Sequence, residues 1–337
     1  MIGIGSIRLL LAVSVLLLHA DVVPFPVAQI AVLTFFYISG FLMERSLKRY
    51  ATWQGFILNR LLRLLPTFLL ISVATWLIIV NSSEEFRQSF GFIYLREASS
   101  YSSEAKPPIS AFAAMEFQWE TPYLGFESEL VPQAWSIGNE IVYYATVPLL
   151  ALMRLRGLIT LVCISLAFLG TQLWQRGDDF DYIIYTNILA MYSFFLAGNL
   201  TSRFLSQGIM VETSLKQVSR WLVPALIIGS YFLQPSDYHA YPVVIGYTLI
   251  LSLFITLGFF AEKEPSGDVE PAFSRLLGGA SYPLYMSHMI VIGCLNYLSL
   301  LHLPILIITS LSLALVIHLL LDRPLERWRG HFRSRSV

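Results

Sequence analysis

Long apolar runs recur along most of the chain and are separated by short polar connections. A membrane-spanning helix needs about 20 apolar residues, within a range of roughly 17–25, and ten segments approach that requirement. The pattern therefore predicts an all-α polytopic membrane protein with about ten transmembrane helices. The seventh span is short and contains Pro224, so its limits are the least defined. The ten predicted spans are residues 3–20, 27–43, 63–80, 134–153, 157–174, 183–200, 221–233, 242–260, 281–300 and 304–321.

Composition supports a membrane protein. Hydrophobic residues make up 56% of the 337 residues and charged residues only 13%, whereas about a quarter of a soluble domain is charged. The 22 basic and 22 acidic side chains balance, so nothing indicates a nucleic-acid partner. The two cysteines, Cys163 and Cys294, lie far apart in apolar runs, which predicts neither a disulfide framework nor a metal site.

The distribution of basic residues predicts the orientation of the chain. With the amino terminus in the cytoplasm, 18 of the 22 lysines and arginines fall on the cytoplasmic side and four on the other side. This asymmetry follows the positive-inside rule. We therefore expect a multi-pass protein of the cell (inner) membrane, in contact with the lipid bilayer, with both termini in the cytoplasm.

The connections indicate a single membrane-embedded domain over residues 1–337. Residues 81–133 form the longest connection, which is rich in Ser, Glu, Pro and aromatic residues, and loops longer than about 12–15 residues are more often functional or disordered. Residues 329–337 form a short basic tail suited to the inner leaflet. No fused extracytoplasmic domain is expected.

Arg8 and His19 are ionisable residues on a predicted membrane helix, where such residues usually face a cavity or a partner. Eleven positions make three helical turns plus roughly 20°, so the two side chains share a face about 16 Å apart along the axis. One interpretation places both in a common cavity. The alternative is an arginine that snorkels to the headgroups and a histidine bonded to a neighbouring carbonyl.

Three further groups of polar residues fall in or beside the spans. Arg60 and Arg63 share a helix face just before the third span and suit either lipid phosphate or the phosphates of a soluble ligand. Glu140 enters the fourth span from the same side as His19, so it pairs with that imidazole or forms a structural ion pair. Tyr285 and His288 lie on one helical stripe with Ser281, where interfacial packing and a satisfied buried histidine are the simpler explanations.

Together these residues resemble the acyltransferase-3 family of integral membrane acyltransferases. The similarity covers about residues 6–328. It departs from the family pattern at Ile137, where leucine is usual, and at Gly138–Asn139, which replace a small–hydrophobic pair. The matching elements, in chain order, are Arg8 followed after ten residues by His19, "FFYISGFL", Arg60 and Arg63 in "RLLRLLP", "WSIGNE", "SYPLYMSH" and "DRPLERW".

The resemblance implies an enzyme that transfers groups other than amino-acyl groups. It implies that an acyl group, usually acetyl, moves from cytoplasmic acyl-CoA to a hydroxyl of an extracytoplasmic or lipid-linked carbohydrate such as O-antigen or exopolysaccharide. Acyl-CoA is then a co-substrate and no cofactor is bound. Some members of the family carry a fused extracytoplasmic domain. Because none is expected here, a separate partner protein on that side is one alternative.

The resemblance also assigns roles. His19 is the expected general base, with Glu140 orienting it, and an acyl-histidine intermediate is the alternative chemistry. Arg8, Arg60 and Arg63 are expected to bind acyl-CoA. The cavity is expected to be lined by Ser39, Trp135, Ser281, Tyr285 and His288.

A membrane transporter is the competing function. Buried His, Glu and Arg residues also mark proton and substrate pathways in carriers of protons, solutes or polysaccharide intermediates. Carriers often contain inverted repeats with broken helices in matching halves, and no such symmetry is visible in this sequence. A non-enzymatic scaffold is the third alternative, but it explains none of the intramembrane charges.

Overall fold

A computed structural model describes residues 3–83, 86, 116–118, 125–127, 131–175, 188–207, 212–233, 241–260 and 272–330. Ten long helices account for most of these residues, and a short helix, α14 (Arg323–Arg329), follows them. The long helices are α1 (Ile4–His19), α2 (Phe25–Leu47), α3 (Trp53–Asn81), α6 (Trp135–Leu152), α7 (Leu155–Gln175), α9 (Ile188–Ser206), α10 (Thr213–Ser230), α11 (Tyr241–Ile255), α12 (Ala272–Tyr297) and α13 (Leu303–Ile317).

Each predicted span coincides with one of these helices, but several helices begin earlier than the apolar run does. α3 begins at Trp53, so Arg60 and Arg63 lie inside it rather than before it. α10 begins at Thr213 and continues through Pro224 to Ser230. An apolar count stops at the first charges, whereas backbone hydrogen bonding continues past the hydrocarbon layer.

The predicted all-α fold is confirmed in the described residues, with one short hairpin in addition. Two short strands, β1 (Glu116–Gln118) and β2 (Gly125–Glu127), pair antiparallel with Phe117 opposite Phe126. They fall within the long connection 81–133, where too few residues alternate in polarity to mark a strand. A 3₁₀ turn, η2 (Pro132–Ala134), then leads into α6.

Six helices in the described ranges are long and apolar enough to cross a membrane by length and composition. The other four long helices are shorter or more polar, and the total of ten spans and the orientation stay predictions. The six candidate spans are Pro26–Leu47, Trp53–Ile78, Leu155–Trp174, Ile188–Ser206, Val243–Phe260 and Leu303–Arg329.

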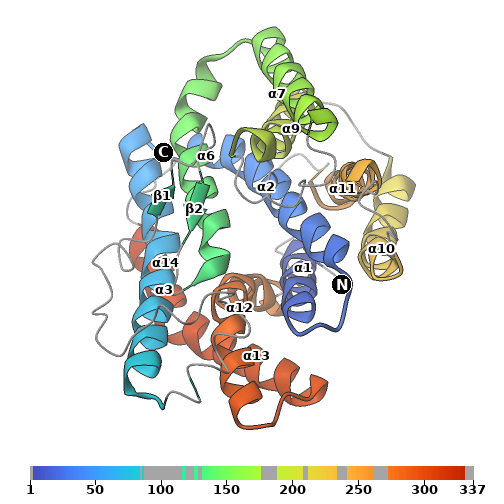
Figure 1. The fold of residues 1–337 in the computed structure, drawn as a ribbon. Coiled ribbons are helices and arrows are strands. Elements are labelled where there is room, and N and C mark those ends of the chain that lie inside the picture. The colour runs from blue at the N-terminus through green and yellow to red at the C-terminus, as the bar shows by residue number, and fades with distance from the viewer. Residues whose placement is uncertain are drawn as a thin grey trace.

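Helix α2 lies at the centre of the bundle and packs against α1, α6, α9 and α11 (Figure 1). In its most apolar window 83% of the residues are buried, compared with 22% in α7. Peripheral helices instead carry exposed large side chains, such as Trp174 on α7 and Trp221 on α10. This difference is expected of a bundle in lipid, where the outer helices present apolar side chains to hydrocarbon.

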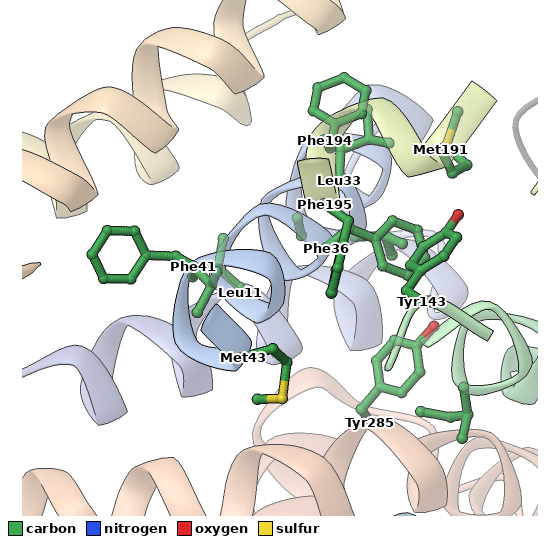
Figure 2. Close-up of a cluster of buried hydrophobic side chains, with 14 of the residues drawn as sticks. Leu11, Leu33, Phe36, Phe41, Met43, Tyr143, Met191, Phe194, Phe195 and Tyr285 are labelled. Carbon is green, nitrogen blue, oxygen red and sulfur yellow. The ribbon is translucent and has the colours of Figure 1, made fainter. Parts of the chain in front are cut away.

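Large aromatic side chains fill the space between α2, α6 and α9 (Figure 2). Phe36 on α2 meets the Tyr143 ring edge-on at 5.5 Å between centroids, and Tyr143 lies 5.3 Å from Phe195. The Tyr143 hydroxyl donates to the Ile188 carbonyl at 2.7 Å. This cluster holds α2 and α6 at a fixed spacing on the side where polar residues line a cavity.

Two glycines allow α2 and α9 to touch backbone to backbone. A Cβ atom placed on Gly198 would lie 2.0 Å from the Tyr37 carbonyl oxygen, and one on Gly40 would lie 1.9 Å from the Phe195 carbonyl oxygen. Small residues at helix crossings permit this close approach in membranes. Gly40 and Gly198 therefore serve the packing of α2 against α9.

We expect Gly198→Ala to destabilise the protein. The new methyl group must push the two helices apart, and overpacking of this kind costs about 1–3 kcal/mol. The measurement is the thermal unfolding midpoint in detergent, with Gly170→Ala on α7 as control because a Cβ there meets nothing within 4 Å. Equal midpoints for the two variants would contradict this packing argument.

Candidate active site

Two neighbouring cavities lie between the helices, and residues of α1, α2, α3 and α12 line both of them. The first, the narrow chamber, has a volume of about 70 Å³ and is lined by Ser39, Glu140 and Tyr285 among others. The second, the wide cavity, has a volume of about 750 Å³ and lies toward the Arg8 end of α1. Four residues line both spaces: Arg8, Leu42, Arg63 and Tyr282. These four residues, called the neck below, form the boundary that the large space and the small one share.

Arginine dominates the wall of the wide cavity. Six arginines line it, against two carboxylates, Asp322 and Glu326. The six are Arg8, Arg60, Arg63, Arg275, Arg323 and Arg329. Such a surface attracts a polyanion, because guanidinium groups donate paired hydrogen bonds to phosphate oxygens.

The C-terminal part of the chain closes one side of the wide cavity. His318 and Asp322 begin and end a π-helical segment, η5 (His318–Asp322), between α13 and α14. Asp322 accepts a hydrogen bond from the Thr67 hydroxyl of α3 at 2.6 Å. Asn59 and Arg329 also exchange bonds with each other's backbone carbonyls. The "DRPLERW" motif is thereby fastened to the helix that carries Arg60 and Arg63.

Arg60 and Arg63 both line the wide cavity, as their spacing predicts, but they differ in their partners. Arg60 is buried and donates to the hydroxyls of Ser46 at 2.6 Å and Tyr50 at 3.3 Å. Arg63 makes no hydrogen bond or ion pair with any residue that the structure describes. Since Arg63 also stands at the neck, its donors are available to a ligand that passes between the two cavities.

Glu140 lies in the narrow chamber, one helical turn below Ser136 on α6. One carboxylate oxygen accepts from the Ser39 hydroxyl at 2.6 Å and the other accepts from the Tyr144 hydroxyl at 2.9 Å. The proposed pairing of Glu140 with His19 is therefore wrong in this structure. The two residues were predicted on the same side of the membrane, but Glu140 lines the chamber while His19 ends α1.

A buried hydrogen-bonded cluster includes two lining residues of the chamber, Ser136 and Tyr285. The hydroxyls of Tyr285 and Ser136 are 2.9 Å apart, and both groups reach the Gln133 carbonyl oxygen. The Gln133 side-chain amide donates to the Met286 carbonyl at 2.7 Å. These contacts join η2 and the first turn of α6 to α12, and Tyr285 points from α12 toward the aromatic cluster (Figure 2).

His288 and His19 lie beyond this cluster. His288 is fully buried, and its Nδ1 lies 2.7 Å from the Tyr285 carbonyl oxygen. Because a carbonyl only accepts, Nδ1 carries the proton and Nε2 of the neutral ring is an acceptor. Nε2 has no hydrogen-bond partner among the described residues. The His19 ring lies 5.2 Å from that of His288 and is exposed at the end of α1.

The structure gathers most of the predicted site residues, with three exceptions. Arg8, Arg63, Ser39, Glu140, Ser281 and Tyr285 line the narrow chamber, and Arg8, Arg60 and Arg63 line the wide cavity. Trp135, His288 and His19 are not among the described residues that line either space. Trp135 packs edge-on against Phe36 instead, at 6.2 Å between ring centroids.

Sequence reasoning missed Gln133, Tyr144 and Tyr282. Tyr144 follows Glu140 by one helical turn, which places its hydroxyl beside the carboxylate, and this spacing was the available signal. Tyr282 lines both cavities and donates to the Leu64 carbonyl at 2.6 Å. Gln133 precedes α6 in a 3₁₀ turn, and no sequence pattern marked it.

Within the described ranges no group of three His, Cys, Asp or Glu side chains is placed to hold a metal ion. That the protein binds no metal and no cofactor stays a prediction, because the structure describes only part of the chain. The arrangement offers an arginine-lined cavity, a narrow chamber with a carboxylate and several hydroxyls, and a histidine pair next to Tyr285.

Comparison with known proteins identifies the family. A family model described as an acyltransferase domain, that of the acyltransferase-3 family, matches residues 1–322 of the 337. No curated protein and no solved structure matches the chain. The matched range contains every cavity residue named above except Arg323, Glu326 and Arg329. The chain belongs to the acyltransferase-3 family of membrane acyltransferases.

Proposed function

We propose that the protein transfers an acetyl group from cytoplasmic acetyl-CoA to a hydroxyl of an extracytoplasmic or lipid-linked carbohydrate at the inner membrane. The observation that carries this proposal is the neck at Arg8 and Arg63. There an arginine-lined cavity of about 750 Å³ lies next to a smaller chamber of about 70 Å³, and the two share four lining residues. A donor with a polyanionic head and a slender arm ending in a thioester fits this shape.

Charge and size support the two halves of the donor separately. Six arginines against two carboxylates favour the phosphates of CoA in the wide cavity. The chamber of about 70 Å³ holds roughly five waters by the usual measure of 10–15 Å³ each. That space suits a group of a few heavy atoms, such as acetyl, better than a long acyl chain.

The proposed reaction needs a base, because a sugar hydroxyl is a weak nucleophile at neutral pH. His19 is exposed, so it is accessible to an acceptor that approaches the end of α1. In our proposal the acceptor oxygen bonds to the thioester carbon as His19 takes its proton. The carbon–sulfur bond breaks, and the sulfur leaves as a thiolate that becomes the CoA thiol on protonation. His288 supports the His19 ring from its buried side.

Glu140 then acts as a positioning residue rather than as the partner of His19. It holds the Ser39 and Tyr144 hydroxyls inside the chamber. We expect Glu140→Gln to lower kcat for acetyl transfer about tenfold or more, since a neutral amide holds the two hydroxyls less strongly. Steady-state kinetics and the thermal midpoint are the measurements. If kcat fell only in proportion to the amount of protein unfolded at the assay temperature, Glu140 would have a structural role alone.

Purified protein with radiolabelled acetyl-CoA and a carbohydrate extract of the cell envelope tests the function. The proposal expects free CoA thiol to appear together with label in the carbohydrate fraction. Unconsumed donor would contradict it. Movement of a solute into proteoliposomes without donor consumption would establish the transporter instead.

A further inference from the structure

We propose that Arg329 of α14 binds the 3′-phosphate of the donor nucleotide, the phosphate group that lies farthest from the thioester. This inference rests on the proposed function, because it assumes that acetyl-CoA occupies the wide cavity. It goes further by assigning one arginine to one phosphate group. Arg329 follows the range that the family model matches, so membership of the family does not assign this residue.

Burial distinguishes Arg329 from most of the other arginines in the wall of the wide cavity. Its side chain is 7% exposed, as is that of Arg60, whereas Arg275 and Arg323 in the same wall are exposed. Taking a charged group out of water is costly unless it is paired and hydrogen-bonded. A buried guanidinium in the wall of a cavity therefore favours an anionic ligand in that cavity.

The described part of the chain leaves most hydrogen-bond donors of Arg329 unused. Its guanidinium makes one hydrogen bond there, which it donates to the Asn59 carbonyl oxygen at 3.4 Å. Its Nε atom is buried without a hydrogen-bond partner among the described residues. A guanidinium has five N–H donors, so donors remain for a ligand. The Asn59 amide also donates to the Arg329 carbonyl at 3.0 Å, which fixes the backbone at this position.

Positive charges close to Arg329 also favour a phosphate. Arg60 and Arg63 are near enough to repel the Arg329 guanidinium. The wall supplies two carboxylates nearby, but Asp322 is already hydrogen-bonded to α3 and Glu326 is exposed. A phosphate monoester carries close to two negative charges at neutral pH and has three acceptor oxygens. Such a group compensates the repulsion and accepts from the unused donors.

The place of Arg329 in the wall favours the 3′-phosphate over the diphosphate of the donor. In the proposed arrangement the thioester lies in the narrow chamber and the pantetheine arm passes the neck. Arg63 belongs to the neck, whereas Arg329 lines only the wide cavity. Along the donor from the thioester, the diphosphate comes first and the ribose 3′-phosphate comes last. We therefore expect the last phosphate at Arg329.

Binding of CoA and of 3′-dephospho-CoA to the purified protein in detergent tests this assignment by isothermal titration calorimetry. The wild-type protein is expected to bind CoA at least about fivefold more tightly than 3′-dephospho-CoA. In Arg329→Gln the Kd for CoA should rise about five- to tenfold, because a neutral amide replaces a charged donor, and the Kd for 3′-dephospho-CoA should change less than about twofold. Arg329→Lys keeps the charge and should keep most of the preference.

Arg327→Gln is the matched control, because Arg327 is an exposed residue of α14 that lines neither cavity. It should leave both Kd values close to those of wild type. Equal Kd values for the two ligands in the wild-type protein would overturn the inference and assign Arg329 to a lipid phosphate. An equal rise of both values in Arg329→Gln would also overturn it, since distortion of the cavity would explain that result. If the wild-type protein binds neither ligand, the proposed function fails instead, so the two failures are distinguishable.

Discussion

His19→Ala is expected to abolish transfer to the carbohydrate while the protein still inserts at normal levels. A positioned general base contributes about 10²–10⁴-fold to the rate, so the loss should be of that size. His19 is the last residue of α1, is exposed, and lines neither cavity, so its replacement should leave both cavities intact. The measurements are the transfer rate and the amount of folded protein in the membrane fraction.

His302→Ala is the matched control for His19→Ala. His302 is also an exposed histidine at a helix end, immediately before α13, and it lies outside both cavities. Its substitution should leave the transfer rate close to that of wild type. Full activity in His19→Ala would remove His19 from the chemistry, and equal losses in both variants would indicate damage to that end of the bundle.

Arg63→Ala is expected to weaken the binding of acetyl-CoA more than any other single arginine substitution in the wide cavity. Arg63 stands at the neck and makes no hydrogen bond or ion pair in the described part of the chain. Hydrogen bonds to charged groups are worth about 1.5–3 kcal/mol, so KM for acetyl-CoA should rise about 10- to 100-fold. Because Arg63 makes no hydrogen bond or ion pair among the described residues, the thermal midpoint should fall less than in Arg60→Ala.

Two comparisons sharpen the test of Arg63. Arg156→Ala removes an exposed arginine from α7, far from both cavities, and should leave KM unchanged. Arg60→Ala should lower stability as well as binding, because Arg60 is buried and holds Ser46 and Tyr50. An unchanged KM in Arg63→Ala would assign that residue to lipid phosphate instead.

Each of the ten predicted spans coincides with a helix. An apolar run of membrane length has few other ways to hydrogen-bond its backbone N–H and C=O groups. The sequence also placed Arg8, Arg63 and Glu140 near one cavity, since each is too costly to leave facing lipid. Helix starts were predicted poorly. At α3 and α12 the helix extends into charged turns, where hydropathy gives no signal.

The pairing of side chains within the site was beyond sequence reasoning. Glu140 and His19 come from the same predicted side, but the rotation of α6 sends the carboxylate to Ser39 and Tyr144. That rotation depends on tertiary contacts such as Tyr143 with Ile188 and Gln133 with Met286. The partner of His19 proved to be His288, 269 positions away on α12. The sequence periodicity shows which residues share a face of one helix, but it does not show which faces of two helices pack together.

In our proposal one acetyl-CoA molecule occupies both cavities: its phosphates lie in the wide cavity and its thioester lies in the narrow chamber beyond Arg63. A cryo-electron microscopy structure of the protein with CoA tests it most directly. We expect the CoA phosphates to lie against Arg63 and the other arginines of the wide cavity. The pantetheine thiol should lie in the narrow chamber that Tyr285 lines. CoA bound elsewhere, or lipid filling the wide cavity in the presence of saturating CoA, would contradict it.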